Sequence, residues 1–235
     1  MRLGIMQPYF FPYIGYISLI KHTDEFILFD TPQFIRHGWI ERNRILKPNG
    51  GWMYISVPLI KHHQRTNIAE IQINNDTAWK EKIIAQLNHY KKAPYYKQII
   101  GLLGDVFCID YKYITSLNKK SLESICEYLG VNANISVFSE MNLEVDEVNA
   151  PDEWALNICK AIPGADEYWN PPGGMEFFDV SKYEKAGIDI RFQKMNLHEY
   201  RQGKSEFEKG LSIIDVMMYN SPEKIHEMLD DFELI

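Results

Sequence analysis

The amino-acid sequence predicts an α/β protein built on βαβ units with a parallel or mostly parallel sheet. Arg2–Met6 and Glu25–Phe29 are short apolar runs of strand length, and a segment of helix length, Ile14–His22, lies between them. A strand, a helix and a second strand in this order normally form a right-handed crossover between parallel strands. Because ligands of such sheets bind at the carboxyl ends of the strands, a functional site is expected where these two strands end.

The remaining elements are predicted from hydrophobic periodicity and from cap residues. Further apolar runs predict strands at Trp52–Val57, Ile68–Ile73, Ile135–Phe138 and Ile188–Phe192. Helices are predicted from Asp76, as N-cap, to Tyr90, from about 113 to 129 before Gly130, and over 151–161. We expect one α/β domain over residues 1–235, with a mostly helical insert or cap near 76–130.

Composition narrows the class of protein. Hydrophobic residues make up 46% and charged residues 24% of the chain, as in ordinary globular proteins. The net charge of −7 is spread along the sequence, which argues against a nucleic-acid partner. No apolar run is long enough to span a membrane, and the N-terminus does not resemble a signal peptide. Three cysteines without a C-x-x-C pair fit reduced thiols, so a cytoplasmic protein is expected; the oligomeric state stays open.

A stiff loop follows the first predicted strand. Between that strand and its helix, the loop has two prolines and four aromatic residues, and Gly15 comes near the first helical turn. Proline fixes the backbone, glycine allows close approach, and a helix N-terminus attracts phosphate or carboxylate groups. Gln7, Tyr13, Gly15 and Tyr16 are therefore candidate substrate-binding residues. The alternative is that the aromatic side chains, Phe10 and Phe11 above all, only fill a hydrophobic corner.

A second group of polar residues follows the second predicted strand, on what the pattern indicates is loop or irregular structure. Asp30 is a candidate base or a group that holds a substrate amine, Asn43 would orient a polar group, and Arg44 would bind a phosphate or carboxylate. These three are the candidate catalytic residues, and Gln33 is a candidate binding residue. The alternative is a solvated surface turn.

Two later segments add candidate binding residues. Asn170, Gly173 and Gly174 belong to a loop where backbone amides would meet a ligand, or to a tight structural turn. Tyr200 and Ser212 belong to a polar stretch, with His198 and Lys204, that would close over the same site. Ser212 is also a plausible helix N-cap. No metal-binding motif is present in the sequence, so no metal site is predicted.

Two stretches carry a resemblance to a known family. The run Met6-Gln7-Pro8-Tyr9-Phe10-Phe11-Pro12-Tyr13-Ile14-Gly15-Tyr16, with Asp30, Gln33 and Arg42-Asn43-Arg44, resembles the N-terminal signature of the WbqC-like family. Trp52 to Val57-Pro58 continues it, and Leu211-Ser212-Ile213-Ile214-Asp215 resembles its C-terminal signature. The resemblance implies a bacterial protein of O-antigen or other surface-polysaccharide biosynthesis. The opening segment is also similar in outline to the HIGH-type nucleotidyltransferases, although it has no histidine.

Three functions follow from these observations. The first is ATP-dependent N-acylation, such as aminoacylation, of a nucleotide-linked amino sugar, with ATP and Mg²⁺ as expected cofactors. The second is a glycosyl or other group transferase that uses a preformed activated donor. The third is a protein that binds a sugar or nucleotide without turnover. The missing histidine counts against the first, and the dense group of Asp30, Asn43 and Arg44 counts against the third.

Overall fold

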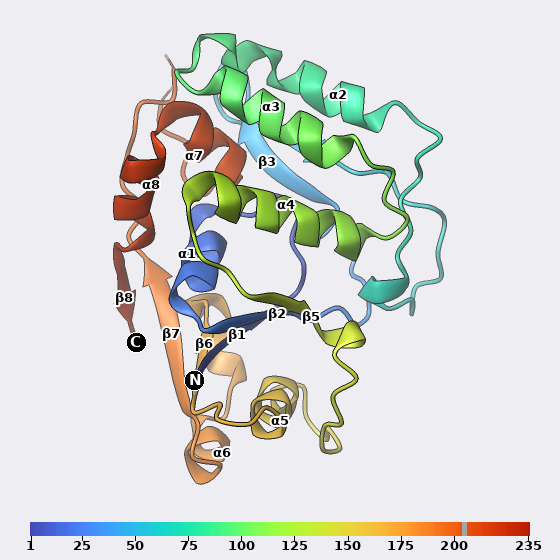
Figure 1. Cartoon of the computed structure of the whole chain (residues 1–235), viewed down its shortest axis with the longest axis vertical. Coiled ribbons are helices and arrows are strands. Elements are labelled where there is room, and N and C mark those ends of the chain that lie inside the picture. The colour runs from blue at the N-terminus through green and yellow to red at the C-terminus, as the bar shows by residue number, and fades with distance from the viewer. Residues whose placement is uncertain (204–205) are drawn as a thin grey trace.

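A six-stranded sheet forms the centre of the molecule, which is described here from a computed structural model covering residues 1–203 and 206–235 (Figure 1). The strand order is β5-β2-β1-β6-β7-β8. The first five strands in this order run parallel, and β8 is antiparallel to β7. The predicted α/β fold with a mostly parallel sheet is thus confirmed. The strands are β1 (Arg2–Met6), β2 (Glu25–Leu28), β5 (Ile135–Val137), β6 (Glu167–Asn170), β7 (Asp189–Met195) and β8 (Phe232–Leu234).

Helices cover both faces of the sheet, because its strands bury side chains on both sides. Leu3 and Ile5 of β1 share one hydrophobic cluster with α5 (Glu153–Ala161) and α6 (Val180–Lys185). The opposite face packs against a larger cluster. That cluster includes side chains from α1 (Ile14–His22), α4 (Ile114–Leu129), α7 (Ile213–Tyr219) and α8 (Pro222–Leu229). Successive side chains of a strand point to opposite faces, which accounts for the two clusters.

The direction of the crossovers reverses between β1 and β6. From β1 the chain crosses through α1, on one face, to β2; from β6 it crosses through α6, on the other face, to β7. The loops that leave β1 and β6 therefore diverge at the carboxyl edge of the sheet. Such a point is where open α/β sheets commonly bind ligands.

A hairpin and a helical layer complete the fold. β3 (Arg42–Leu46) pairs with β4 (Trp52–Ser56) in an antiparallel hairpin separate from the main sheet. In Figure 1, α2 (Trp79–Gln86) and α3 (Tyr96–Phe107) lie above β3, and α4 lies between them and the sheet. The segment predicted to be helical, 76–130, is thus mostly helical, and it shares the hydrophobic cluster of α1. Short 3-10 helices occur at Ile68–Glu70, Leu87–Lys92, Phe138–Glu140 and Pro172–Phe177.

Several predicted elements are wrong or incomplete. Arg42–Leu46, expected to be irregular, is strand β3, because it pairs with a strand that follows a short turn. Ile68–Ile73, expected to be a strand, is a 3-10 turn followed by isolated bridges. Its isoleucines are buried in a loop, so burial alone produced a strand-like pattern. The helix expected from Asp76 starts at Trp79.

Other expectations hold. Trp52–Val57 contains β4, although this strand lies outside the main sheet. The predicted strands at 135–138 and 188–192 contain or overlap β5 and β7. α4 ends at Gly130, whose left-handed φ of 68° lets its N–H bond back to the last turn. β6, α3, α6 and β8 were not predicted as separate elements. Among the described residues, no helix is long and apolar enough to cross a membrane.

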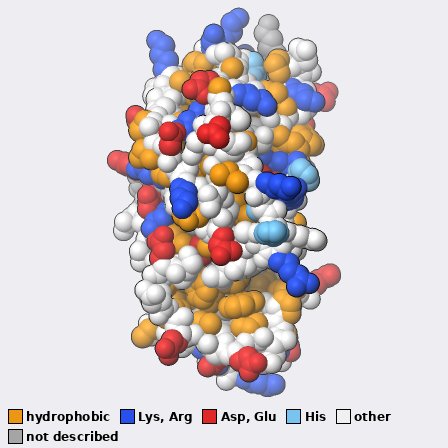
Figure 2. Space-filling model, turned by 90° about the vertical axis from the view of Figure 1, so that its right-hand side faces the viewer, with side chains coloured by type: hydrophobic (Ala, Val, Ile, Leu, Met, Phe, Trp, Pro, Cys, Tyr) orange, Lys and Arg blue, Asp and Glu red, His pale blue; other side chains and the backbone are white. Residues whose placement is uncertain are grey.

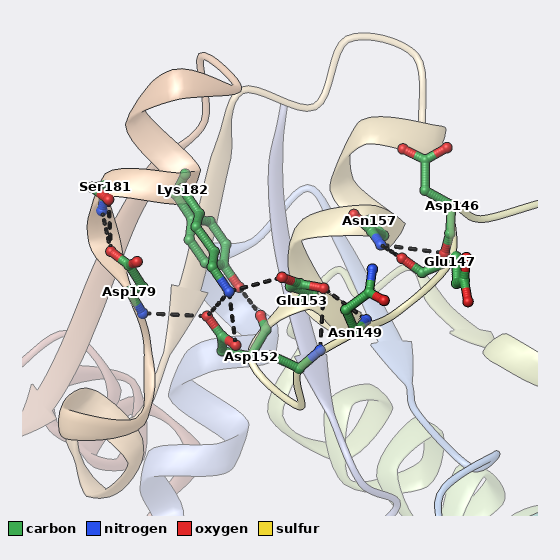
Figure 3. A network of polar contacts seen from close by, with 11 residues as sticks. Asp146, Glu147, Asn149, Asp152, Glu153, Asn157, Asp179, Ser181 and Lys182 are labelled. Atoms are coloured by element: carbon green, nitrogen blue, oxygen red, sulfur yellow. Dashed lines mark hydrogen bonds and ion pairs between the residues drawn. The ribbon is translucent and has the colours of Figure 1, made fainter.

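A network of hydrogen bonds and ion pairs links the start of α5 to α6 (Figure 3). The Lys182 ammonium lies 2.8 Å from Glu153 and 3.2 Å from Asp152, and the Glu153 carboxylate accepts the N–H groups of Asn149 and Ala150. Asp179 caps α6 through the N–H of Ser181. One ammonium thus pairs with two carboxylates, and the network links the first residues of α5 to α6.

Candidate functional site

The proline-rich loop after β1 is held by hydrogen bonds to its carbonyl groups. The Tyr16 hydroxyl donates to Gln7 O at 2.8 Å, and the Asn118 amide donates to Pro8 O at 2.8 Å. The Asn43 amide nitrogen lies 3.0 Å from the carbonyl oxygens of both Phe10 and Phe11. The loop is therefore fixed along its length by side chains from α1, α4 and β3.

The tightest point of this loop is Phe11. Its φ of 38° lies in the left-handed region, which is strained for a residue other than glycine. Its carbonyl oxygen also accepts the Ser212 hydroxyl at 2.6 Å, and Ile213 N donates to Pro12 O at 2.7 Å. Strained backbone persists only where surrounding contacts over-determine it, and such strain clusters at functional sites.

Beside the loop lies a cavity of about 700 Å³ that we name the aromatic groove. It opens beyond the carboxyl ends of β1 and β7, next to the first residues of β3. Its lining comes from four segments far apart in the sequence: Tyr9, Pro12, Tyr13, Trp39, Asn43, Arg44, Met195, Leu197, Glu208, Lys209 and Gly210. Of the stretches 7–16 and 30–44, which were expected to meet at the edge of the sheet, residues 9–13 and 39–44 do meet, whereas Asp30 and Gln33 line other hollows.

Arg44 is the central cation of the groove. Its guanidinium carbon lies 5.4 Å from the centre of the Trp39 ring and 5.2 Å from that of Trp52. One terminal nitrogen donates to Gly210 O at 3.3 Å, and the other forms no hydrogen bond in the described part of the chain; Nε is buried without a partner. Stacking on aromatic faces orients the guanidinium and leaves donors available for an anion.

The phenols of the groove are neutral donors. Burial raises the pKa of Tyr9, and burial with the neighbouring Tyr9 raises the pKa of Tyr13. Gly15 has a specific role, because a Cβ on it would overlap the Tyr13 ring. The ring thus lies over the first turn of α1, where an anion was expected, and Gly15 makes room for the phenol.

Some candidate residues lie beside the groove with their polar atoms already bonded. Asn43 is only 4% exposed, and its side-chain oxygen accepts Arg44 N as its nitrogen holds the loop. Ser212 is buried and caps α7, which confirms that alternative, and Tyr16 is buried under Gln7. Half-buried Gln7 does not line the groove. Asn43 thus belongs to the wall of the groove, whereas Tyr16 and Ser212 hold the loop beside it.

Tyr200 belongs to a buried network around Asp215. The hydroxyls of Tyr90 and Tyr200 each donate to the Asp215 carboxylate at 2.6 Å, and Gln202 donates at 2.8 Å. Burial raises the pKa of Asp215. Gln202 also bonds both backbone groups of Glu208, so the network positions the groove wall at Glu208–Gly210. Lys204 lies outside the described residues.

Other candidates lie elsewhere. Asp30 lines a separate hollow, and its carboxylate accepts the N–H and hydroxyl of Ser139 at 3.0 and 2.8 Å. Gln33 bridges to Asn67 and lines a third, shallow surface hollow. Asn170 ends β6, with Gly173 and Gly174 in the 3-10 turn that follows. None of these lines the aromatic groove, and their roles remain predictions.

Sequence reasoning missed Tyr9, Trp39, Glu208 and Lys209 as groove residues. Tyr9 and Trp39 lie in the two segments that already contained candidate residues, so membership in those segments was the available signal for them. Glu208 and Lys209 are brought in by a loop near the C-terminus, and no local pattern marks them. Among the described residues, no group of three His, Cys, Asp or Glu side chains could hold a metal ion.

Comparison with known proteins agrees with the signatures of the loop and of α7. The family model described as "WbqC-like protein family" matches residues 7–227. A curated relative from Mycobacterium tuberculosis, the uncharacterized protein Rv1507c, is 27% identical over 220 residues, which cover 92% of each chain. No solved structure matches. Because the family model covers nearly the whole chain, including the fastened loop and the groove, this protein belongs to the WbqC-like family.

Proposed function

We propose that this protein is an enzyme of bacterial surface-polysaccharide biosynthesis that acylates the amine of a nucleotide-linked amino sugar, with ATP as activating substrate. The observation that carries the proposal is the aromatic groove, in which Arg44 packs against Trp39 and Trp52. Sugars present apolar C–H faces that suit aromatic side chains, and a nucleotide sugar adds a diphosphate that suits a guanidinium.

The size and polarity of the groove suit such a substrate. Its volume of about 700 Å³ lies within the range of about 300–1,000 Å³ that small-molecule sites occupy. Arg44 and the exposed Lys209 would bind the diphosphate. Tyr9, Tyr13 and Trp39 would contact the sugar or the base. The groove thus combines apolar walls with a few directed polar groups, as small-molecule sites do.

The chemistry needs an activated acyl group and a base. ATP would convert a small carboxylate into an acyl-adenylate with release of pyrophosphate. The amine nitrogen then attacks the acyl carbon, the bond to the AMP oxygen breaks, and the proton of the nitrogen passes to the base. Glu208 is the carboxylate in the groove wall and takes this role. Mg²⁺ would enter on the phosphate oxygens, as it commonly does at phosphate-transfer sites.

A second candidate is a transferase with a preformed activated donor. The position of Tyr13 favours it, because the ring lies over the first turn of α1, where a HIGH-type protein would hold an ATP phosphate. In this case the groove binds the nucleotide sugar as donor, and no ATP is consumed.

Calorimetry with UDP-glucosamine as probe tests the groove. We expect Arg44→Ala to weaken binding by about tenfold or more, because a charge-assisted bond contributes about 1.5–3 kcal/mol and 1.4 kcal/mol is tenfold. Arg42→Ala is the matched control, since Arg42, also on β3, stacks on Tyr54 and lines another hollow. Equal effects of the two variants would refute the groove as the binding site.

A pyrophosphate assay separates the alternatives. Release of pyrophosphate that requires ATP, UDP-glucosamine and an amino acid together supports N-acylation. Consumption of a nucleotide sugar without ATP supports the second candidate. Binding without any turnover would leave a sugar or nucleotide-binding protein and refute both enzymatic proposals.

A further inference from the structure

A second cavity at the carboxyl edge of the sheet is separate from the aromatic groove. We name it the α4 hollow; its volume is about 430 Å³. It lies where β2 and β5 end and α4 begins, on the side of the molecule that Figure 2 shows. Its lining consists of Asp30, Ala69, Tyr113, Thr115, Ser116, Lys119, Lys120, Glu123, Val137, Ser139 and Glu140.

One side of the hollow suits a carboxylate. α4 has 16 residues, and its first turn carries no acidic side chain and no side-chain cap. In this first turn the N–H of Ile114 donates to Ile71 O, whereas those of Thr115 and Ser116 have no hydrogen-bond partner in the described chain. The positive end of the helix dipole lies beside them. Thr115, in this turn, is only 5% exposed, and its hydroxyl has no hydrogen-bond partner among the described residues. A hydroxyl without a partner is able to donate to an acceptor brought next to this turn.

Lysine side chains add positive charge beside this turn. Lys119 and Lys120 line the hollow, both half-buried, and neither forms an ion pair with a described residue. They lie one helical turn beyond Thr115 and Ser116. A bound carboxylate would therefore meet a hydroxyl, free N–H groups and ammonium groups together.

The opposite side of the hollow suits an ammonium. Asp30 is 1% exposed, and its carboxylate is bonded only to the neutral N–H and hydroxyl of Ser139 within the described chain. Burial raises the pKa of this carboxyl. An unpaired buried charge is costly, so a cation brought next to Asp30 would stabilise it.

We infer that the α4 hollow binds a free amino acid. The carboxylate of the ligand lies against the first turn of α4, with the Thr115 hydroxyl and the lysines, and its ammonium lies against Asp30. A phosphate fits less well, because Asp30, Glu123 and Glu140 line the same space. On the face shown in Figure 2, positive and negative side chains alternate without a field of one sign. The inference goes beyond the proposed function and does not depend on the groove.

Titration of the full chain with proteinogenic amino acids, followed by calorimetry, tests the inference. At least one amino acid should bind. Its hydroxy-acid analogue, which lacks the ammonium, and its decarboxylated amine, which lacks the carboxylate, should each bind about tenfold more weakly or not at all. For alanine these probes are lactate and ethylamine. Binding of inorganic phosphate alone, or of no amino acid, would overturn the inference.

Two variants locate the site. Asp30→Asn removes the charge that faces the ammonium, and Thr115→Val removes only the free hydroxyl, so each should weaken amino-acid binding. Melting curves establish that the variants are folded. Arg44→Ala should leave amino-acid binding unchanged, which separates failure of this inference from failure of the groove proposal. Unchanged binding in both Asp30→Asn and Thr115→Val would place the amino acid elsewhere and refute the assignment.

Discussion

The aromatic groove and the α4 hollow both open at the carboxyl edge of the sheet, yet they use polar side chains in different ways. Beside the groove, Asn43 and Ser212 bond to the backbone of the loop, and stacked Arg44 keeps free donors. In the hollow, the Thr115 hydroxyl and the lysines have no partner among the described residues. A polar residue near a cavity therefore indicates ligand binding only when its hydrogen bonds are not already made or, as for Asp30, when its charge has no partner among the described residues.

Loss of a loop anchor should have the largest effect on stability. Asn43→Ala leaves the Phe10 carbonyl without its donor and the Arg44 N–H without its acceptor, whereas Phe11 O keeps the Ser212 hydroxyl; each buried group left unsatisfied costs about 1–3 kcal/mol. We expect the free energy of unfolding, measured in urea, to fall by about 3 kcal/mol. The control is Asn132→Ala, an exposed site, where the change should stay within about 0.5 kcal/mol. A small loss at Asn43 would show that the loop holds without it.

The next largest loss of stability is expected at two serine residues that cap helices. Ser212 caps α7 and also donates to Phe11 O, whereas Ser221 caps α8 through Lys224 N alone. Loss of an N-cap costs about 0.5–2 kcal/mol, so Ser212→Ala should lie near about 2 kcal/mol and Ser221→Ala near about 1 kcal/mol. Thermal or urea unfolding of both variants measures the difference. Equal losses would mean that the bond to the loop contributes nothing.

The smallest effect is on the pH dependence of stability. Burial raises the pKa of Asp30 above its ordinary value of 3.8 in the folded state. The folded protein then holds this proton more tightly than the unfolded chain, so stability falls as pH rises from 3.8 through the raised pKa. Asp30→Asn should flatten that fall. Urea unfolding across acidic pH measures it, and an identical slope in the variant would contradict the buried, unpaired state of Asp30.

Much of the fold could be predicted because local periodicity reflects burial. The first βαβ unit, α4 with its Gly130 terminus, and the strands β5 and β7 follow from short apolar runs and cap residues. The pattern failed where burial came without regular structure, as at Ile68–Ile73, and where polar residues stand in a strand, as at Arg42–Leu46. The pattern of apolar residues indicates which side chains contact the core. The pairing of backbone hydrogen bonds decides whether the segment is a strand, a helix or a loop.

The candidate site was predicted in part. The meeting of residues 9–13 with residues 39–44 agrees with the rule that the carboxyl ends of parallel strands share an edge. Arg44 and Tyr13 line the groove, but Asp30 lines another hollow, on the far side of β2 from β1 and next to β5. Separation along the sequence does not show on which side of a strand a following loop turns, so Asp30 and Asn43 were grouped together.

The sequence alone determined the family signature, the α/β class and the presence of a stiff loop with arginine nearby, since these depend on residue type and short-range spacing. Only the tertiary structure decided which polar groups remain free. Asn43 finds its partners 32 and 33 residues away, and Ser212 bonds a carbonyl 201 residues away. Hydrogen bonds between distant segments exist only after the chain has packed. Whether a polar side chain holds the wall of a cavity or is free to bind a ligand is therefore decided only in the folded protein.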